Sequence, residues 1–503
     1  MEHSKDRHTA MTQRMAYALG ILALTLGMGC LKRSPASSTL NEKLADLAAW
    51  VPEEMEGLVV VSSLEAAKVS LEQLEFRSSW EPLREALKKF REGVKEKSGL
   101  DLLALSTWQE MGLHIRAPLL FGVHVNEKVG LFVLPVLDEA LFLAALEKHG
   151  VSQGAWEAQP DMPQGLRAWK MDADDFVVWV QKPGHALLLV GNSLEVLQRA
   201  AQLSAEKSWA KHKEEMLEIG SRLPSDRVVS AWIHPHESRL KEVAWIGLAV
   251  TMQPRAKVVV DVTWRQGEEP FLPAMQTMPL DSEKWTQGLE GVLLGFWSSA
   301  TWDWYVGMLK RYSSRGRDLD GAEEKLLELL TKRLNSPVLW RVWPQEATGA
   351  GDFWERLHWS VDFFFSKESD TEGFLSALAF LFSLEKAETA QAGFHIPVWQ
   401  MRVGQQKLLV QVLDKSKLRI ANGLHSYGHE ETPHVLQKAV MQEMMRFPVA
   451  FAAHLNTLAK EKAVHAILGE GRMEKAEYML LGLRAEEGHA QFVGEHFTET
   501  DFE

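Results

Sequence analysis

The sequence predicts an α+β protein with two tandem, duplicated domains, each a mainly antiparallel sheet covered by helices. Three observations lead to this prediction. Runs of β-branched and aromatic residues are separated by short turns, which favours antiparallel pairing. The helical segments between them are amphipathic, so each has one apolar face to bury. Finally, the order of these segments repeats after about 220 residues.

Length and composition set limits on the protein class. The chain has 503 residues, enough for several domains that each bury a core. Its composition, 46% hydrophobic and 24% charged, is ordinary for a globular protein. The net charge of −13 at pH 7 repels polyanions. We therefore expect no nucleic-acid partner.

The amino-terminal segment has the features of an export signal. Met15 to Gly29 carries no charged residue and follows Arg14. A membrane-spanning helix needs roughly 20 apolar residues, so this run is too short for a permanent span. We expect a signal peptide over 1–29 that starts at Met1 or Met11.

The end of this segment resembles the lipobox of bacterial lipoproteins. Gly29 precedes Cys30 as in that motif, although Gly27 stands where a large aliphatic residue is usual. The resemblance implies cleavage before Cys30, diacylation of Cys30 and a lipid anchor in the membrane. Cys30 is also the only cysteine in the chain, so the body has no thiol to oxidise in a disulfide-forming compartment. The alternatives are a buried core cysteine and a transmembrane anchor.

Leu31, which follows the cysteine, bears on localisation. In lipoprotein sorting an Asp at this position retains the protein in the inner membrane. The resemblance therefore implies that Leu31 permits transfer to the outer membrane, facing the periplasm. We expect a lipidated, flexible tether over 30–40, because the stretch is rich in serine and contains proline and basic residues.

The first domain is predicted over 41–266. Its helices have apolar residues on one face, as Leu83, Leu87 and Phe90 illustrate, and Asn192 or Ser193 is a suitable N-cap. The predicted helices are 44–50, 81–99, 138–150 and 193–205, and the predicted strands are 58–64, 117–125, 128–136, 165–172, 175–181, 185–192, 228–234 and 257–264.

A linker is predicted over 267–282 and the second domain over 283–503. Strands ending at Asn192 and Asn422 each lead to the tripeptide VLQ, and we interpret the two VLQ segments as equivalent helices. In the same way, VVSAWIH ends at His234 and PVAFAAH ends at His454. The alternative is that freely placed gaps make any two α+β stretches look alike. The order of parts resembles that of uncharacterised exported bacterial proteins with duplicated α+β domains.

Catalytic motifs are absent from the sequence. It has no Gly-x-Ser-x-Gly elbow, no phosphate-binding Gly-rich loop with Lys and no His-Glu-x-x-His helix. We therefore predict no enzymatic activity, no cofactor and no metal site. His234 and His236, two apart in an extended segment, come nearest to a metal site, but two ligands are fewer than a metal requires. The histidines in 425–434 are interpreted as part of a solvated loop.

The remaining hypothesis is a non-enzymatic cell-envelope lipoprotein that binds or scaffolds another envelope component. The alternative is a periplasmic carrier or chaperone for an apolar ligand or an unfolded outer-membrane protein, and a metal-dependent hydrolase is less favoured. Ligand sites occur preferentially at domain interfaces, so we expect the binding surface near the linker. The candidate residues are Phe271, Leu272, Trp302 and Trp304. The alternative is that Phe271 and Leu272 only hold the two domains together and that the two tryptophans pack in the core.

The lipidation prediction is tested by Cys30→Ser. Without the thiol no diacylglycerol can be attached, so the variant is expected as an unprocessed or soluble form. Fatty-acid labelling and fractionation of membranes measure the outcome. Labelling that persists in the variant would contradict the prediction.

Overall fold

The structure is a computed structural model of the chain. It divides by internal contacts into two compact units, Met1–Glu268 (unit 1) and Glu269–Glu503 (unit 2). The residues that it describes are 47–77, 88, 92, 104–124, 129–148, 156–266 with short gaps, 294–299, 337–344, 357–386 with short gaps, 398–422 except 404–405, 435–455, and 477–498 except 487.

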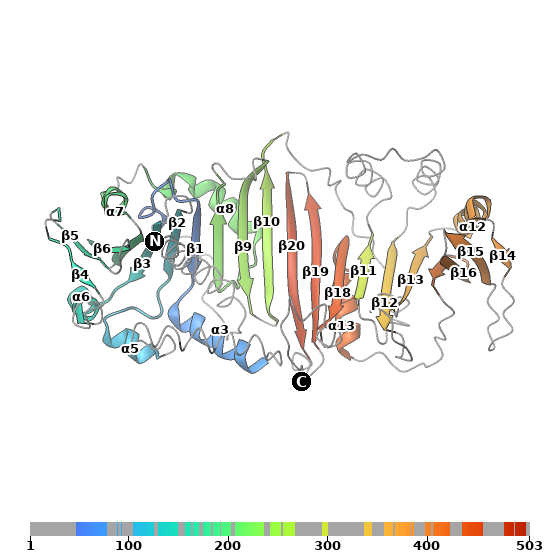
Figure 1. The fold of residues 1–503 in the computed structure, drawn as a ribbon, viewed down its shortest axis with the longest axis horizontal. Coiled ribbons are helices and arrows are strands. Elements are labelled where there is room, and N and C mark those ends of the chain that lie inside the picture. The colour runs from blue at the N-terminus through green and yellow to red at the C-terminus, as the bar shows by residue number, and fades with distance from the viewer. Residues whose placement is uncertain are drawn as a thin grey trace, which may run out of the picture. The chain divides into compact units, whose positions relative to one another are not determined.

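The described strands of unit 1 form one antiparallel sheet around its first strand. β1 (Gly57–Val61) pairs with β2 (Leu119–His124) on one side and with β8 (Val229–Ile233) on the other. The order across the sheet is β4-β5-β6-β7-β3-β2-β1-β8-β9-β10 (Figure 1). The other strands are β3 (Val129–Pro135), β4 (Glu157–Ala158), β5 (Leu166–Lys170), β6 (Phe176–Lys182), β7 (His185–Gly191), β9 (Val243–Thr251) and β10 (Lys257–Trp264).

Unit 2 has the same arrangement. β11 (Leu294–Ser298) pairs with β12 (Val338–Pro344) and β18 (Val449–His454), again antiparallel. The order is β14-β15-β16-β17-β13-β12-β11-β18-β19-β20, which repeats the order in unit 1 strand by strand. The other strands are β13 (Leu357–Phe364), β14 (Glu385–Lys386), β15 (Val398–Val403), β16 (Gln406–Asp414), β17 (Lys417–Ala421), β19 (Glu477–Glu486) and β20 (His489–Thr498).

The predicted mainly antiparallel sheet with helices is confirmed in both units. The domain limits 41–266, 267–282 and 283–503 stay a prediction. Most of the predicted helix 81–99 lies outside the described residues. In the part of the chain that the structure describes, no helix is both long enough and apolar enough to cross a membrane.

Helices pack against the outer strands of unit 1. α6 (Glu139–Leu146) begins at Asp138, whose carboxylate accepts a hydrogen bond from the Leu141 amide at 2.9 Å. Its buried Phe142 lies 5.5 Å from the ring of Trp179 on β6. Together with α5 (Leu105–Glu110) it closes an apolar cluster over β5–β7.

A second helix, α7 (Leu194–Ala201), also packs on β6 and β7. Ser193 is its N-cap and accepts a hydrogen bond from the Val196 amide, as the sequence predicted for Asn192 or Ser193. Residues 177–180 of β6 are buried without alternation, so both faces of this strand are covered.

The central strands of unit 1 carry two further helices. α3 (Leu64–Arg77) contributes Ala66 and Ala67 to an apolar cluster with β1, β2, β8 and β9. α8 (Lys213–Arg222) approaches β9 so closely that a Cβ on Gly247 would lie 2.3 Å from Ile219. Only glycine allows this approach at position 247.

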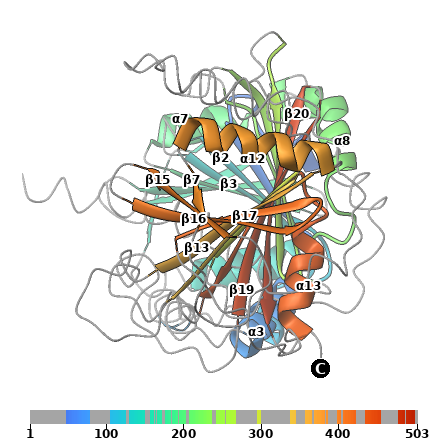
Figure 2. The same ribbon diagram turned by 90° about the vertical axis from the view of Figure 1, so that its right-hand side faces the viewer.

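Unit 2 is covered in a related way. α12 (Glu368–Phe382) crosses β15 and packs Phe374 and Leu378 into an apolar cluster with β13 and β15–β17 (Figure 2). α13 (Val435–Met444) packs on β18, β19 and β20. Phe447 follows this helix, and a Cβ on Gly482 of β19 would lie only 2.5 Å from its ring. Position 482 therefore also requires glycine.

The interpretation of the two VLQ segments as equivalent helices is wrong. α7 packs on β6 and β7, whereas α13 packs on β18–β20 and so occupies in unit 2 the place of α8 in unit 1. The shared tripeptide reflects helical periodicity, which specifies an apolar face but not the strands that this face covers.

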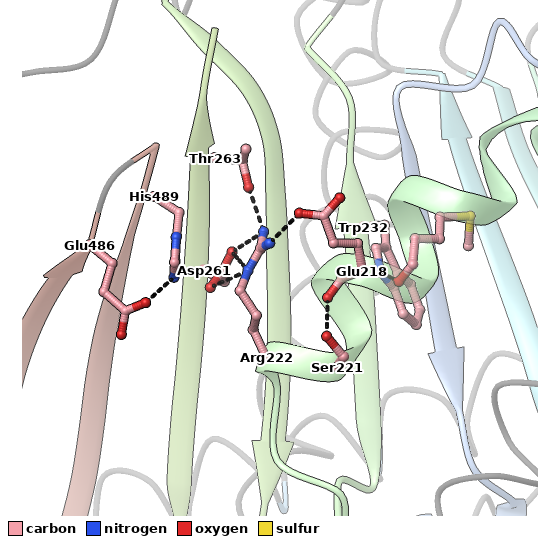
Figure 3. A network of polar contacts seen from close by, with 9 residues as sticks. Glu218, Ser221, Arg222, Trp232, Asp261, Thr263, Glu486 and His489 are labelled. Atoms are coloured by element: carbon pink, nitrogen blue, oxygen red, sulfur yellow. Dashed lines mark hydrogen bonds and ion pairs between the residues drawn. The ribbon is translucent and has the colours of Figure 1, made fainter. Parts of the chain in front are cut away.

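An ion-pair network fixes α8 to β10. The guanidinium of Arg222, at the end of α8, donates to both carboxylate oxygens of Asp261 at 2.9–3.2 Å and to the Thr263 hydroxyl at 2.7 Å (Figure 3). Asp261 is fully buried. Although partial burial acts in the opposite direction, the hydrogen bond to Asp261 raises the pKa of Arg222. Glu218 on the same helix completes the network at 2.8 Å.

Replacing this arginine tests how strongly the network holds unit 1 together. Arg222→Met removes the guanidinium from a buried carboxylate, and we expect a loss of roughly 3 kcal/mol in the free energy of unfolding. Urea denaturation measures the change. Glu218→Gln is the control, because the Glu218 side chain is exposed and a surface ion pair contributes at most about 1 kcal/mol. Equal losses in both variants would contradict the prediction.

Candidate functional site

The structure places His234 in a cluster of histidine and tryptophan side chains at the end of β8. The ring of His234 lies 4.5 Å from that of Trp245 on β9. His212, which ends η3 (Trp209–His212), lies 5.3 Å from His234 and 5.2 Å from Trp245. Trp209 packs edge-on against Trp245 at 5.8 Å. The two tryptophans are buried and the two histidines are half-buried. We call these four residues the His–Trp cluster.

The His–Trp cluster holds the first described segment of the chain, 47–56. The Trp209 indole donates to the Met55 carbonyl and its amide to the Val51 carbonyl, both at 2.9 Å. The His234 amide donates to the Glu56 carbonyl at 2.9 Å. These bonds join η3, the end of β8 and the segment that leads into β1.

Two further contacts strengthen this attachment. The Glu53 amide donates to the Lys207 carbonyl at 3.0 Å, and the Lys211 ammonium forms an ion pair with the Glu53 carboxylate. The hydrogen bond from Lys211 lowers the pKa of Glu53. The His–Trp cluster therefore lies beside a hydrogen-bonded joint between segment 47–56 and the sheet.

Unit 2 contains a matching pair. His454 at the end of β18 lies 4.7 Å from Tyr478 on β19, with the rings inclined by 32°. His234 and Trp245 are inclined by 36°. His454 and Tyr478 are cross-strand neighbours, and continuing the β8–β9 register by one residue makes His234 and Trp245 neighbours as well. The histidine-on-aromatic stack is thus present at the same place in both sheets.

The metal-site candidates His234 and His236 can be compared with the structure only in part. His236 lies outside the described residues. Among the residues that the structure describes, no three His, Cys, Asp or Glu side chains are arranged to hold a metal ion. His212, which the sequence analysis did not single out, is the histidine that the fold brings to His234. Only a tertiary contact reveals it, because the two residues belong to different elements.

The predicted binding residues cannot be compared with the structure. Cys30, Phe271, Leu272, Trp302 and Trp304 all lie outside the described residues, as does the histidine-containing stretch 425–434. Their roles stay predictions.

An apolar surface that the sequence analysis missed lies on β19 and β20. Met479, Leu481 and Phe492 are 43%, 50% and 44% exposed. The strand register places all three on one face, since Leu481 pairs with Gly494 and Leu483 with Phe492. We call these three side chains the apolar strip. The sequence of β19 has apolar residues on both faces of the strand, so it does not tell which face stays open.

A buried ionic cluster lies on the inner strands of unit 2. Asp362 of β13 is fully buried and accepts hydrogen bonds from Arg341 of β12 and Arg419 of β17, the latter at 2.8 Å. The Lys417 ammonium lies 3.3 Å from the same carboxylate. Burial alone would raise the pKa of Asp362, but Arg341, Arg419 and Lys417 more than offset this and hold it well below the usual range. Burial lowers the pKa of Lys417.

Unit 1 has apolar residues and a glycine at the corresponding ladder positions. Following the registers from β1 and β11 outward places Val133 and Leu187 where unit 2 has Asp362 and Arg419. Gly122 stands where unit 2 has Arg341, and a Cβ there would lie 3.1 Å from Val51. The two units therefore fill the same region of the sheet with different chemistry.

Comparison of the chain with models of protein families, with curated proteins and with solved structures gave no match.

Because of the ionic cluster, we expect the folded state of unit 2 to lose stability in acid. The depressed pKa of Asp362 stabilises the folded state above the ordinary carboxyl pKa of about 3.9, and this stabilisation is lost as the pH falls below it. Asp362→Asn removes this dependence and destabilises the unit at neutral pH by roughly 3 kcal/mol, because the cations lose their buried counter-charge.

Urea unfolding of Asp362→Asn between about pH 7 and about pH 2.5 measures both effects. Asp414→Asn is the matched control, since Asp414 is an exposed aspartate of β16 whose side chain accepts hydrogen bonds from Ser416. An unchanged slope of stability against pH in Asp362→Asn would contradict the prediction.

Proposed function

We propose that the protein is a bacterial cell-envelope lipoprotein, anchored through Cys30, whose folded body binds another envelope protein and catalyses no reaction. The anchor rests on the lipobox-like end of the amino-terminal segment and on the single cysteine. The binding role rests on the apolar strip of β19 and β20.

The apolar strip is the observation that carries this proposal. Seven large apolar side chains are exposed in the described part of the chain, and three of them share this one face of a hairpin. On β18, Phe451 pairs with Leu481 and extends the same face with a half-buried ring. Grouped exposed apolar side chains on a sheet are typical of protein interaction sites, whereas single ones are ordinary. A flat sheet face is suited to another folded surface.

We also infer that the two units arose by duplication. Their strand orders agree throughout, and each has a histidine stacked on an aromatic residue at the end of the strand that follows the covering helix. Corresponding amides of Ser62 and Ser299 donate to the carbonyls that precede β8 and β18, those of Val228 and Pro448. Such agreement in register is not expected from shared fold class alone. The buried charges around Asp362 then arose, or were lost, in one copy.

Removing the apolar strip tests the binding role. Leu481→Ser combined with Phe492→Ser deletes two exposed apolar side chains, and each Leu or Phe buried in an interface contributes about 1.5–3 kcal/mol. We expect at least roughly tenfold weaker association with the envelope partner that the native chain cross-links. Cross-linking in envelope fractions identifies that partner, and titration with the purified pair measures the affinity.

Phe380→Ser provides the matched control, since Phe380 is 84% exposed but lies on α12. It should bind like the native chain. Equal binding by the double variant would move the interaction away from the apolar strip. Lipid that co-purifies with the native chain and is absent from the double variant would instead support a carrier of apolar ligands, and steady turnover of a substrate would overturn the non-enzymatic proposal.

A further inference from the structure

The two histidines of the His–Trp cluster lie so close together that two positive charges on them would repel each other. Their ring centroids are 5.3 Å apart, and both rings pack against Trp245. Histidine is the side chain whose charge changes between about pH 5 and 8. Two imidazolium ions at this separation repel each other, more strongly when partly shielded from water.

One proton on this pair has favourable surroundings. The Glu215 carboxylate lies 4.0 Å from Nδ1 of His212, and the face of Trp245 favours a cation stacked on it. A second proton faces the repulsion of the first. The closed cluster therefore accommodates one charge readily and two poorly.

Among the residues that the structure describes, the other charged groups near the cluster are nearly balanced in sign. Segment 47–56 supplies Glu53 and Glu56. The residues before η3 supply Lys207, and η3 itself supplies Lys211. From the ends of β9 and β10 come Glu242 and Arg265, whose guanidinium donates to the Pro235 carbonyl at 3.3 Å. With Glu215 on α8, this set does not supply a large excess of negative charge for two imidazolium ions.

The groups that surround the histidines also hold segment 47–56. His234 contributes its amide to the Glu56 carbonyl, and Trp209, packed beside His212, holds Met55 and Val51. Any movement that separates His212 from His234 therefore acts directly on these bonds. In unit 2, His454 stacks on Tyr478 with no second histidine among its described ring neighbours.

We propose that the His–Trp cluster is a pH-sensitive clasp that holds segment 47–56 on unit 1 near neutral pH and releases it on acidification. In the released state the two imidazoles separate, so each can take up a proton without facing the positive charge of the other. The open state thus binds more protons than the closed state, so acid favours opening. If the proposed lipid anchor at Cys30 is correct, release lengthens the tether between the membrane and the sheet; the release itself does not depend on the anchor.

Hydrogen exchange of the full-length chain followed by mass spectrometry tests the clasp. Between about pH 7.5 and about pH 5.5, and after correction for intrinsic exchange, amides in 47–56 should lose protection by roughly fivefold, because the open state binds one proton more than the closed state. Amides of β19 and β20 should keep theirs, which distinguishes release from global unfolding. Unchanged protection of 47–56, or simultaneous loss in both regions, would overturn the proposal.

Three variants identify the groups responsible. His234→Gln should remove the pH response, because the remaining His212 has no second imidazolium to repel it. His454→Gln, the matched change in unit 2, should leave the response intact. Glu215→Gln, a change at an exposed position, should move the release to higher pH, because a proton on His212 loses the nearby carboxylate. A native response in both His234→Gln and Glu215→Gln would refute the assignment to this pair.

Discussion

Each unit depends on the pairing of its first described strand with the next strand and with one that comes much later in the chain. β1 pairs with β2 and also with β8, so residues 57–61 lie beside residues 229–233. This long-range pairing lowers the entropy of the chain, because a long loop must close before the contacts between the strands can form. Once it has formed, the segment between β2 and β8 is confined to one side, where it makes the outer strands β3–β7. β11 and β18 impose the same constraint on unit 2.

The helices then follow from the faces that this pairing leaves open. α8 and α13 cover the strands beyond β8 and β18. A glycine allows a close approach in each unit, that of Ile219 on α8 to Gly247 and that of Phe447, just after α13, to Gly482. Because a β-strand alternates its side chains, covering one face leaves the other free for different use. In β19 and β20 the face opposite Phe447 carries the apolar strip, which is why we place partner binding there.

The two units share a strand order but place different residues on their inner strands. Unit 1 fills its inner strands with apolar residues such as Val133 and Leu187, and places two histidines at the joint that holds the amino-terminal segment. Unit 2 places Asp362 and its cations in the inner strands instead. Buried charges that are paired contribute little net stability but are costly to disturb, so they favour one defined arrangement. We infer that unit 1 is adapted to hold segment 47–56 and unit 2 to present a surface.

The sequence by itself determined the mainly antiparallel α+β class and most strands with turn punctuation, such as 58–64 and 185–192, because hydrophobic periodicity is a local property. It left β9 and β19 unassigned, since VAWIGLAVT and EYMLLGLRAE do not follow a simple alternation of apolar and polar residues. Arg341, Asp362 and Arg419 were visible only as single charges within apolar strands. Which charges meet, which helix covers which strands, and which face of β19 stays exposed were decided by the tertiary structure. The tertiary structure also decided the approach of His212 to His234. All these features depend on contacts between residues far apart in the chain, about which local periodicity carries no information.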